Sequence, residues 1–246
     1  MRSPVLVFLS SLTSLQNLRQ SLGHPGYARL YHFVRQRDLP HSCEETKRVC
    51  RNYRTCAEVK PFFRLSSQTL VQAVRPWDRL RIWDRLSVDF RGPVRGPRPY
   101  LLIVIDEYSR FPFVFPCKNV SSSSVVECLS SLFCIQGFPS CVHSDPGASF
   151  VSQETRAFLT ESEIAFSTST PYHPKGNSQC ERPNQTVWRT VKLLLHDKKL
   201  PEDRCEMVLP EALHSVRSLV CLATNETPHE RLFRFSRRAN PGTSLP

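Results

Sequence analysis

Three acidic residues stand at the ends of strand-like or helical segments, where their side chains could meet and bind metal. Asp89 closes a strand-like segment in SVDFRGP, and Asp145 closes another in VHSDPG. Glu181 opens a long helical pattern, with thirty-five residues between it and Asp145. Because acids at strand ends on one edge of a sheet can converge, we expect these three to form one site. The plain alternatives are exposed loop charges and, for Glu181 in the pattern SQCE, a helix-capping role.

Carboxylates that converge need a partner of positive charge. Two of them about 4 Å apart repel by about 4 kcal/mol at an effective dielectric of about 20, so such a site takes up protons or binds a cation. Carboxylate oxygens suit Mg²⁺ or Mn²⁺, which keep positions open for water and phosphate. Two such ions can hold the attacking and leaving oxygens of an in-line phosphoryl transfer. The three acids therefore predict a site for two Mg²⁺ or Mn²⁺ ions.

The hydrophobic pattern predicts the strands and helices that must position these acids. Short apolar runs indicate strands, and YLLIVI at 100–105 is the clearest of them. The predicted strands cover residues 86–90, 100–105, 111–115, 139–143 and 164–167. The predicted helices cover residues 121–134, 153–159, 178–195 and 207–222. Three strands in sequence, followed by alternating helices and strands, indicate an α/β fold with a mixed central sheet flanked by helices.

The residues before the first strand read as a helical segment followed by a linker. Apolar residues recur at loosely helical spacing, with breaks at Pro25-Gly26 and Leu39-Pro40. They are Leu15, Leu18, Leu22, Leu30, Phe33 and Val34. Residues 61–82 resemble a linker, and the tetrapeptide WDRL occurs twice as a small tandem duplication, at 77–80 and 83–86. At the other end, residues 228–246 are polar and basic and are expected to form a frayed tail.

The charge of the chain indicates an anionic partner. Its 246 residues carry a net charge of +11, with a pI of about 9.4, which is typical of proteins that bind nucleic acid. Residues 1–100 hold a net charge of +11, residues 101–180 hold −3 and residues 181–246 hold +3. Basic flanks suit a phosphate backbone and an acidic centre suits a metal ion, whereas plain solvated surface is the alternative interpretation.

The composition excludes several classes of protein. No run approaches the ~18 apolar residues of a membrane-spanning helix, and the apolar stretch after Arg2 is shorter than that of a secretory signal. Ten cysteines at irregular spacing are too few for a disulfide scaffold and indicate free thiols in a reducing compartment. We therefore expect an intracellular protein without a membrane partner.

Seven short motifs resemble those of the integrases of gypsy-type LTR retrotransposons, which are retroviral-like enzymes. Together they extend over roughly residues 22–235, and their combination is highly specific. They are GHPG (23–26), Cys56 with Lys60-Pro61, PWDRLSVDFRGP in its duplicated form ending at Pro93, YLLIVIDEYSRF (100–111), VHSDPGASF (142–150), TPYHPKGNSQCER (170–182) and NETPHERLF (225–233). A degenerate or domesticated copy of such an integrase is one alternative within this resemblance.

The resemblance implies an RNase H-like catalytic core preceded by a small helical zinc-binding-like segment. It implies that Asp89, Asp145 and Glu181 are catalytic and bind two Mg²⁺ or Mn²⁺ ions. The implied activity is that of a polynucleotidyl transferase, which trims the 3′ ends of element DNA and joins them to target DNA. The implied partners are these DNA ends, the target DNA and further copies of the same chain. The implied location is the nucleus, for which RFSRR at 234–238 is a weak basic cluster.

The segment at 171–177 resembles the mobile loop that precedes the catalytic helix in this family. The expected nucleic-acid contacts at this loop and at the start of the helix are Lys175, Asn177, Gln179 and Arg182. A solvated loop lysine is the alternative for Lys175. The predicted domains are a leader at 1–15, a zinc-binding-like segment at 16–62, a linker at 63–82, a catalytic core at 83–222 and a basic tail at 223–246.

The zinc-binding-like segment departs from the family pattern, which pairs two histidines with Cys-x-x-Cys. His24 and Cys56 match two ligand positions, but Tyr53 stands at the first cysteine, and QNLRQ at 16–20 holds no upstream histidine. Tyrosine is not a usual zinc ligand. Substitutes at wider spacing than structural zinc sites usually show are His32, Cys43 and Cys50. Two interpretations therefore remain open. In one, the segment binds zinc through His24 and Cys56, and in the other it binds no metal.

Two prolines lie beside the acids. Pro146 pushes Asp145 toward an extended backbone, which a strand end tolerates. Pro183 would kink a helix that begins at Ser178, at a cost of ~3 kcal/mol, and could move the carboxylate of Glu181. A helix that begins at Pro183 would instead leave Glu181 on a loop. The alternatives to an active integrase are a catalytically silent nucleic-acid-binding protein and, on the same core, a nuclease of RNA–DNA hybrids.

Overall fold

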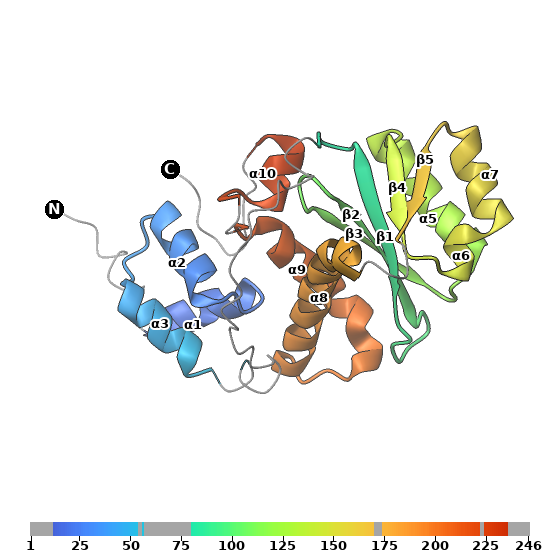
Figure 1. Ribbon diagram of the computed structural model, residues 1–246. Coiled ribbons are helices and arrows are strands. Elements are labelled where there is room, and N and C mark those ends of the chain that lie inside the picture. Colours follow the sequence, from blue (N-terminus) through green and yellow to red (C-terminus); the bar gives the residue numbers. More distant parts are fainter. Residues whose placement is uncertain (1–11, 54–55, 57–79, 170–173, 222–223, 236–246) are drawn as a thin grey trace. The chain divides into compact units, whose positions relative to one another are not determined.

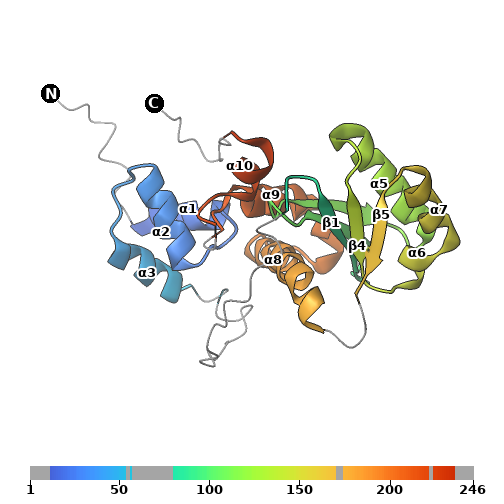
Figure 2. The same ribbon diagram turned by 45° about the horizontal axis from the view of Figure 1, so that its top comes forward.

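The structure is a computed structural model that describes residues 12–53, 56, 80–169, 174–221 and 224–235, with the backbone alone for residues 12–14 and 174–183. The chain divides into two compact units, whose elements are labelled in Figures 1 and 2. The sheet unit comprises residues 64–188 and 202–206, and the helical unit comprises residues 1–63, 189–201 and 207–246.

The sheet unit is built on a mixed sheet, whose described strands follow the order β3-β2-β1-β4-β5. Strand β1 (Arg85–Arg91) pairs antiparallel with β2 (Tyr100–Asp106), which pairs antiparallel with β3 (Pro112–Cys117). On its other side, β1 pairs parallel with β4 (Cys141–Ser144), which pairs parallel with β5 (Ala165–Thr168). The predicted α/β fold with a mixed central sheet is thus confirmed, with β1 at its centre.

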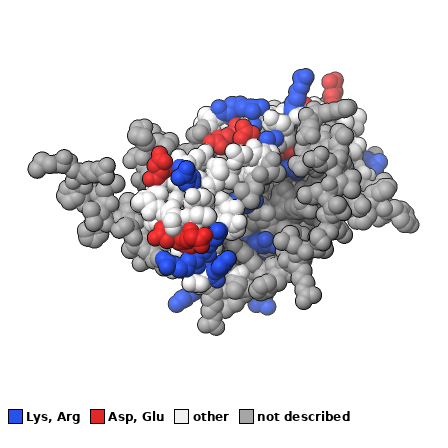
Figure 3. Space-filling view, turned by 60° about the vertical axis from the view of Figure 1, so that its left-hand side comes forward, with Lys and Arg blue, Asp and Glu red and all other residues white. Residues whose placement is uncertain are grey.

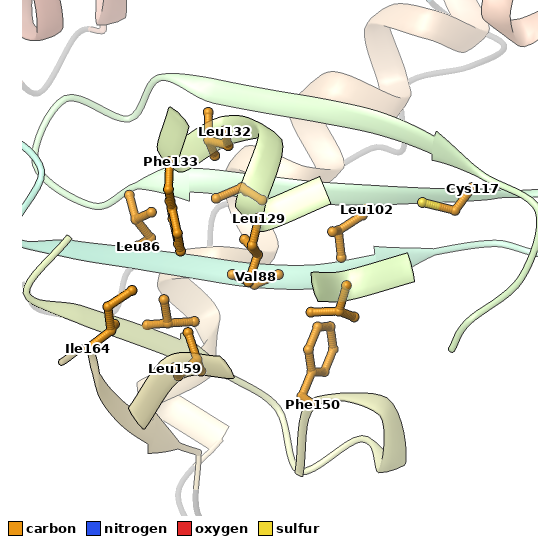
Figure 4. Packing of buried hydrophobic residues seen from close by; sticks show 13 residues of the cluster. Leu86, Val88, Leu102, Cys117, Leu129, Leu132, Phe133, Phe150, Leu159 and Ile164 are labelled. Carbon is orange, nitrogen blue, oxygen red and sulfur yellow. The ribbon is translucent and has the colours of Figure 1, made fainter. Parts of the chain in front are cut away.

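The main hydrophobic core packs one face of this sheet against helices. These are α5 (Ser122–Gln136), the short α6 (Ala148–Val151) and α7 (Gln153–Glu161). Figure 4 shows the side chains from sheet and helices that meet there. The buried members are Leu86, Val88, Leu102, Val104, Cys117, Val125, Leu129, Leu132, Phe133, Val142, Phe150, Leu159 and Ile164. The predicted helices at 121–134 and 153–159 are confirmed, whereas the single turn of α6 carries too little periodicity to predict.

The alternation of side chains along β1 decides what lies on the second face of the sheet. Leu86 and Val88 belong to the core, so Ser87 and Asp89, which alternate with them along the strand, point to the opposite face. The same parity holds across the ladder, because Asp89 pairs with Ile103 of β2 and Val88 pairs with Val104. Burial of the core residues therefore fixes Asp89 on the face away from α5 and α7.

The helical unit begins with three short helices, α1 (Leu12–Ser21), α2 (Tyr27–Gln36) and α3 (Cys43–Arg51). Helix α3 starts at a capping box, in which the Ser42 hydroxyl accepts from the Glu45 backbone N–H and Glu45 accepts from the Ser42 N–H. The buried apolar cluster of this unit consists of Leu15, Leu22, Leu30, Phe33, Val34, Val49 and Leu219. Residues predicted from their helical spacing supply most of this cluster.

The C-terminal helices differ from the prediction at three places. Helix α8 (Pro174–Asp197) begins four residues before Ser178 and continues through Pro183, so a helix beginning at Pro183 is wrong. For the same reason residues 174–177 are helical rather than part of a loop. Helix α9 (Cys205–Ser218) follows a short 3-10 turn at Glu202–Arg204 and ends four residues earlier than predicted.

The predicted frayed tail is wrong for its first residues, because Pro228–Phe233 form helix α10. Thr227 and Glu230 make a capping box at its start. Pro228 occupies the first turn, where proline is tolerated because a backbone N–H at this position would have no acceptor within the helix. Two further parts of the chain lie outside the described residues, at 57–79 and at 236–246. The first of these parts includes most of the predicted linker and the first three residues of the first WDRL copy.

Two expectations about chemistry and membranes can be checked in the described part of the chain. All nine described cysteines are free thiols, as their irregular spacing indicated. Within the same described ranges, no helix has both the length and the apolar character that crossing a membrane requires.

The core on the α5 face predicts a strong effect of truncating Leu129. This side chain is fully buried, so Leu129→Ala is expected to lower the free energy of unfolding of the sheet unit by about 2–5 kcal/mol. The matched control, Ile135→Ala, changes a side chain on the same helix that is 79% exposed, and its effect should stay within about 0.5 kcal/mol. Urea unfolding followed by tryptophan fluorescence measures both, because all three tryptophans belong to the sheet unit. Equal effects of the two substitutions would contradict this packing.

Candidate active site

The first two predicted acids lie where the parallel pairing of β1 and β4 ends, with Asp89 two residues before the end of β1 and Asp145 directly after β4. In the register of β1 and β4, Val88 lies beside Ser144. Asp89 and Asp145 are the next residues after this pair. Both side chains are half-buried. Parallel pairing brings the two strand ends to the same edge of the sheet, as the sequence analysis expected. The structure therefore places these two carboxylates close enough for the charge of Asp145 to act on Asp89.

Asp145 is fixed by the turn that follows β4. Its Oδ1 accepts a hydrogen bond of 3.1 Å from the backbone N–H of Gly147. A Cβ added at Gly147 would come within 3.0 Å of that same oxygen, so a larger residue there would crowd the carboxylate. Pro146 lies between the two, and β4 ends at Ser144, directly before Asp145.

Asp89 is held by a residue that the sequence analysis missed. The side-chain amide of Asn184 on α8 donates a hydrogen bond of 2.7 Å to Oδ2 of Asp89. Asn184 is buried, and its Oδ1 has no hydrogen-bond partner among the described residues. The one available signal was its position three residues after Glu181, on the same face of the predicted helix.

Burial raises the pKa of Asp89 above its ordinary value, and the nearby negative charge of Asp145 raises it further. The Asn184 hydrogen bond, the Phe90 backbone and the charge of Arg91 act in the opposite direction without cancelling the effect. The net direction shows a carboxylate whose burial is not offset by the hydrogen bonds and the positive charge around it. Such a site gains free energy by binding a proton or a cation.

The third acid is placed by its backbone alone. Glu181 lies in α8, and residues at 177, 181 and 184 recur at the spacing that shares one face of a helix. Since Asn184 contacts Asp89, this backbone position puts Glu181 on the face of α8 that includes the Asp89 contact. Lys175, Gln179 and Arg182 recur in the same way on another face of the helix start.

A basic and aromatic pair borders the site on β1 and α8. The guanidinium of Arg91, two residues after Asp89 on the same face of the strand, lies over the ring of Trp188 at 5.7 Å from its centroid. Trp188 follows Asn184 by one helical turn. This contact joins β1 and α8, the same two elements that bring Asp89 and Asn184 together.

The two candidate zinc ligands belong to the helical unit, and neither is available for a metal. His24 pairs with Asp197, and the Cys56 sulfur accepts a hydrogen bond from Arg19. Over the described residues, no three His, Cys, Asp or Glu side chains are grouped so that they could hold a metal ion. At the acidic site this leaves the described pair Asp89 and Asp145, since the Glu181 side chain lies outside the described part.

Comparison with known proteins finds a family model that matches part of the sheet unit. Residues 83–174 match the integrase core domain. The Pro-Pol polyprotein of simian foamy virus type 3 (strain LK3) is 30% identical over 162 residues, which cover 65% of this chain and 14% of that protein. An uncharacterised protein of Caenorhabditis elegans is 29% identical over 229 residues, which cover 91% of this chain and 17% of that protein. The chain thus spans less than a fifth of the length of these relatives.

Solved structures share the fold. The HTLV-2 integrase catalytic core domain, in complex with magnesium in a trimeric form, has a TM-score of 0.50 at 22% identity and covers 62% of this chain and 97% of that one. A simian T-cell lymphotropic virus intasome has a TM-score of 0.62 at 18% identity and covers 95% of this chain and 77% of that one. The fold is therefore the RNase H-like fold of integrase catalytic cores, as the sequence motifs implied.

The raised pKa of Asp89 predicts how stability depends on pH. In metal-free buffer the folded sheet unit keeps the Asp89 proton to higher pH than the unfolded chain does, so its stability falls as pH rises through that window. Asp89→Asn removes this fall, while its amide oxygen can still accept from Asn184, so the variant should be the more stable protein at neutral pH. Unfolding followed by tryptophan fluorescence measures this difference in stability. The measurements run from pH 4 to pH 8, which spans the titration of carboxyl groups with ordinary and raised pKa.

The exposed acid Glu161, at the end of α7, supplies the matched control. Glu161→Gln should leave the pH dependence of wild type unchanged. An Asp89→Asn protein that is less stable than wild type at neutral pH, or whose difference from wild type does not grow with pH, would contradict the assigned charge imbalance.

Proposed function

We propose that the chain is an integrase-type polynucleotidyl transferase of gypsy-type retrotransposon origin, which processes and joins DNA 3′ ends. The observation that carries this proposal is that Asp89 and Asp145 directly follow the last parallel pair of β1 and β4, Val88 and Ser144, and that the pKa of Asp89 is raised. A structural ion pair would lower that pKa, whereas a site that awaits cations raises it.

The proposed cofactors are two Mg²⁺ or Mn²⁺ ions. The donor set fits them, because Asp89 and Asp145 offer only carboxylate oxygens, which hard divalent cations prefer. Glu181 is proposed as the third ligand. The magnesium in the HTLV-2 core structure supports this choice of cation. When bound, the ions would activate the attacking hydroxyl or water and offset charge on the leaving oxygen.

The protein's own contribution to the chemistry is to hold the carboxylates in place. Asn184 fixes Oδ2 of Asp89 by a hydrogen bond, and the lone pairs of the carboxylate that remain can still bind a cation. The Gly147 backbone N–H fixes Oδ1 of Asp145 in the same manner. Each acid is therefore restrained through one side of its carboxylate, which lowers the entropy cost of assembling the site.

The proposed DNA contacts follow from the start of α8 and from the charge of the chain. Lys175, Gln179 and Arg182 share one face of the helix by their backbone positions, and Asn177 lies on the face that includes Glu181. We propose that these four residues meet phosphates and bases next to the scissile bond. The net charge of +11 supports binding to a polyanion.

The proposal extends to assembly and location. The neighbouring structures are described as a trimeric form and as an intasome, which supports the action of several copies together on DNA ends. Joining to a chromosomal target requires the protein to reach the nucleus, so we propose that location.

The activity can be tested without knowing the sequence of the DNA ends. Transesterification exchanges one phosphodiester for another, so the enzyme should also resolve a branched oligonucleotide duplex in which the joining step is already complete. With Mn²⁺, wild type should release the joined strand, and Asp89→Asn, Asp145→Asn and Glu181→Gln should fall to background. Asn184→Ala should lose roughly 10- to 100-fold, as expected for a residue that orients a ligand. Gel analysis of labelled strands measures the release.

Glu161→Gln is the control for the charge change, because this exposed acid lies outside the site. It should retain wild-type activity. Wild-type protein that is folded and binds the branched DNA but releases no strand with either cation would contradict the proposal. It would favour the catalytically silent nucleic-acid-binding protein instead.

A further inference from the structure

The helical unit brings four side chains of the zinc-binding-like segment together. They are the two candidate ligands His24 and Cys56, Tyr53 at the position of the first cysteine, and Gln20, which we assign to the position of the missing upstream histidine because it contacts Tyr53. The side-chain amide of Gln20 donates to the Tyr53 hydroxyl at 2.8 Å, and the rings of His24 and Tyr53 lie 4.8 Å apart. The two positions that lack a zinc ligand therefore contact each other directly.

We propose that a hydrogen-bonded cluster centred on Asp197 holds this unit together in place of zinc. Asp197 is the last residue of α8. One of its carboxylate oxygens, Oδ1, accepts from the Tyr53 hydroxyl at 2.9 Å, and the other pairs with Nε2 of His24. The single carboxylate thus joins the end of α1, the segment after α3 and the end of α8, which is what a structural metal ion does for a small domain.

Burial makes the loss of one member of this cluster more destabilising than the loss of a surface contact. His24 is 2% exposed and Asp197 only 14% exposed at its side chain, so their polar atoms have little access to water. Burial also raises the pKa of Tyr53, so its hydroxyl stays protonated and remains a donor to Asp197. Removing one member would leave the others buried without their partner, which is the costly outcome for polar groups.

The surroundings of Cys56 disfavour a metal at the same place. The Arg19 side chain is 1% exposed, and its Nη2 donates to the Cys56 sulfur at 3.0 Å. The same guanidinium lies 4.9 Å from the centroid of the Tyr53 ring. Zinc binds a thiolate at about 2.3 Å, so an ion on this sulfur would lie beside a buried positive charge. Their repulsion in a site with little water opposes binding.

The residues of the unit therefore do not fit zinc. Of the four positions only His24 and Cys56 carry zinc-ligating side chains, and both already have partners in the cluster. His32, Cys43 and Cys50 join no group of three potential ligands within the described residues. The zinc expected from the family resemblance is replaced by side-chain hydrogen bonds and an ion pair.

Metal analysis of the full-length protein tests the proposal. Protein purified with zinc in the buffer and then passed through a desalting column should retain less than about 0.1 equivalent of zinc by mass spectrometry. Asp145→Asn protein is measured beside it, because any zinc held by the acidic site is lost in that variant. About one equivalent of zinc in both proteins would overturn the proposal.

Hydrogen–deuterium exchange shows what holds the unit together. A chelator should leave the exchange of peptides from residues 12–53 unchanged, whereas Asp197→Ala should raise it roughly tenfold or more. Asp203→Ala, which removes an exposed acid of the sheet unit, is the matched control and should not raise it. Faster exchange on chelation, or none in Asp197→Ala, would overturn the role given to the cluster.

A gain of zinc binding tests the identity of the replaced positions. Gln20→His combined with Tyr53→Cys restores two histidines and Cys-x-x-Cys, and Arg19→Met removes the positive charge that opposes zinc at Cys56. This triple variant should retain about one equivalent of zinc. Uptake by the variant but not by wild type supports the replacement. No uptake by a folded triple variant would overturn the assignment of Gln20 and Tyr53 as former ligand positions. None of these measurements depends on the catalytic proposal.

Discussion

The burial of the Asp89 carboxylate beside a second acid, Asp145, is the constraint around which the sheet unit is arranged. Burial removes water from the Asp89 carboxylate, and the negative charge of Asp145 adds to that cost, so the fold must hold the Asp89 side chain in place. The core on the other face of the sheet supplies the holding, because burial of Leu86 and Val88 fixes the side on which Asp89 points. Helix α8 supplies the rest, since Asn184 reaches Asp89 and Arg91 packs on Trp188. The fold thus tolerates a local cost at the place where it can do chemistry.

The N-terminal segment treats buried polar groups in the opposite way. Its cluster pairs a carboxylate with a histidine and a phenol, and a guanidinium with a sulfur, so these groups are partnered within the protein. Among the described residues, Nη1 of the Arg19 guanidinium has no hydrogen-bond partner. Partnered polar groups of this kind stabilise a fold. The contrast between the two units explains why the same chain can keep an acidic site that fits metal ions while replacing a structural one.

The sequence predicts the sheet and the position of two acids because both depend on local patterns. Apolar runs mark β1, β2 and β3, and Asp89 and Asp145 stand near the carboxyl ends of β1 and β4. Asn184 and Asp197 could not be found in this way. Each acts through a partner 95 or 173 residues away, and no local pattern records such a contact. Helix α10 was missed for a different reason, because its capping box, Thr227 with Glu230, was present in a segment judged by its charge.

We propose that Asp89, Asp145 and Glu181 form one cation site. Anomalous X-ray scattering from crystals grown with Mn²⁺ detects such a site. We expect manganese peaks between the carboxylates of Asp89 and Asp145, at about 2.0–2.2 Å from their oxygens, with Glu181 as a further ligand. Manganese absent from these carboxylates at saturating concentration, or a Glu181 carboxylate well beyond about 8 Å from the Asp89 carboxylate, would contradict it, because paired catalytic ions lie only about 3.5–4 Å apart.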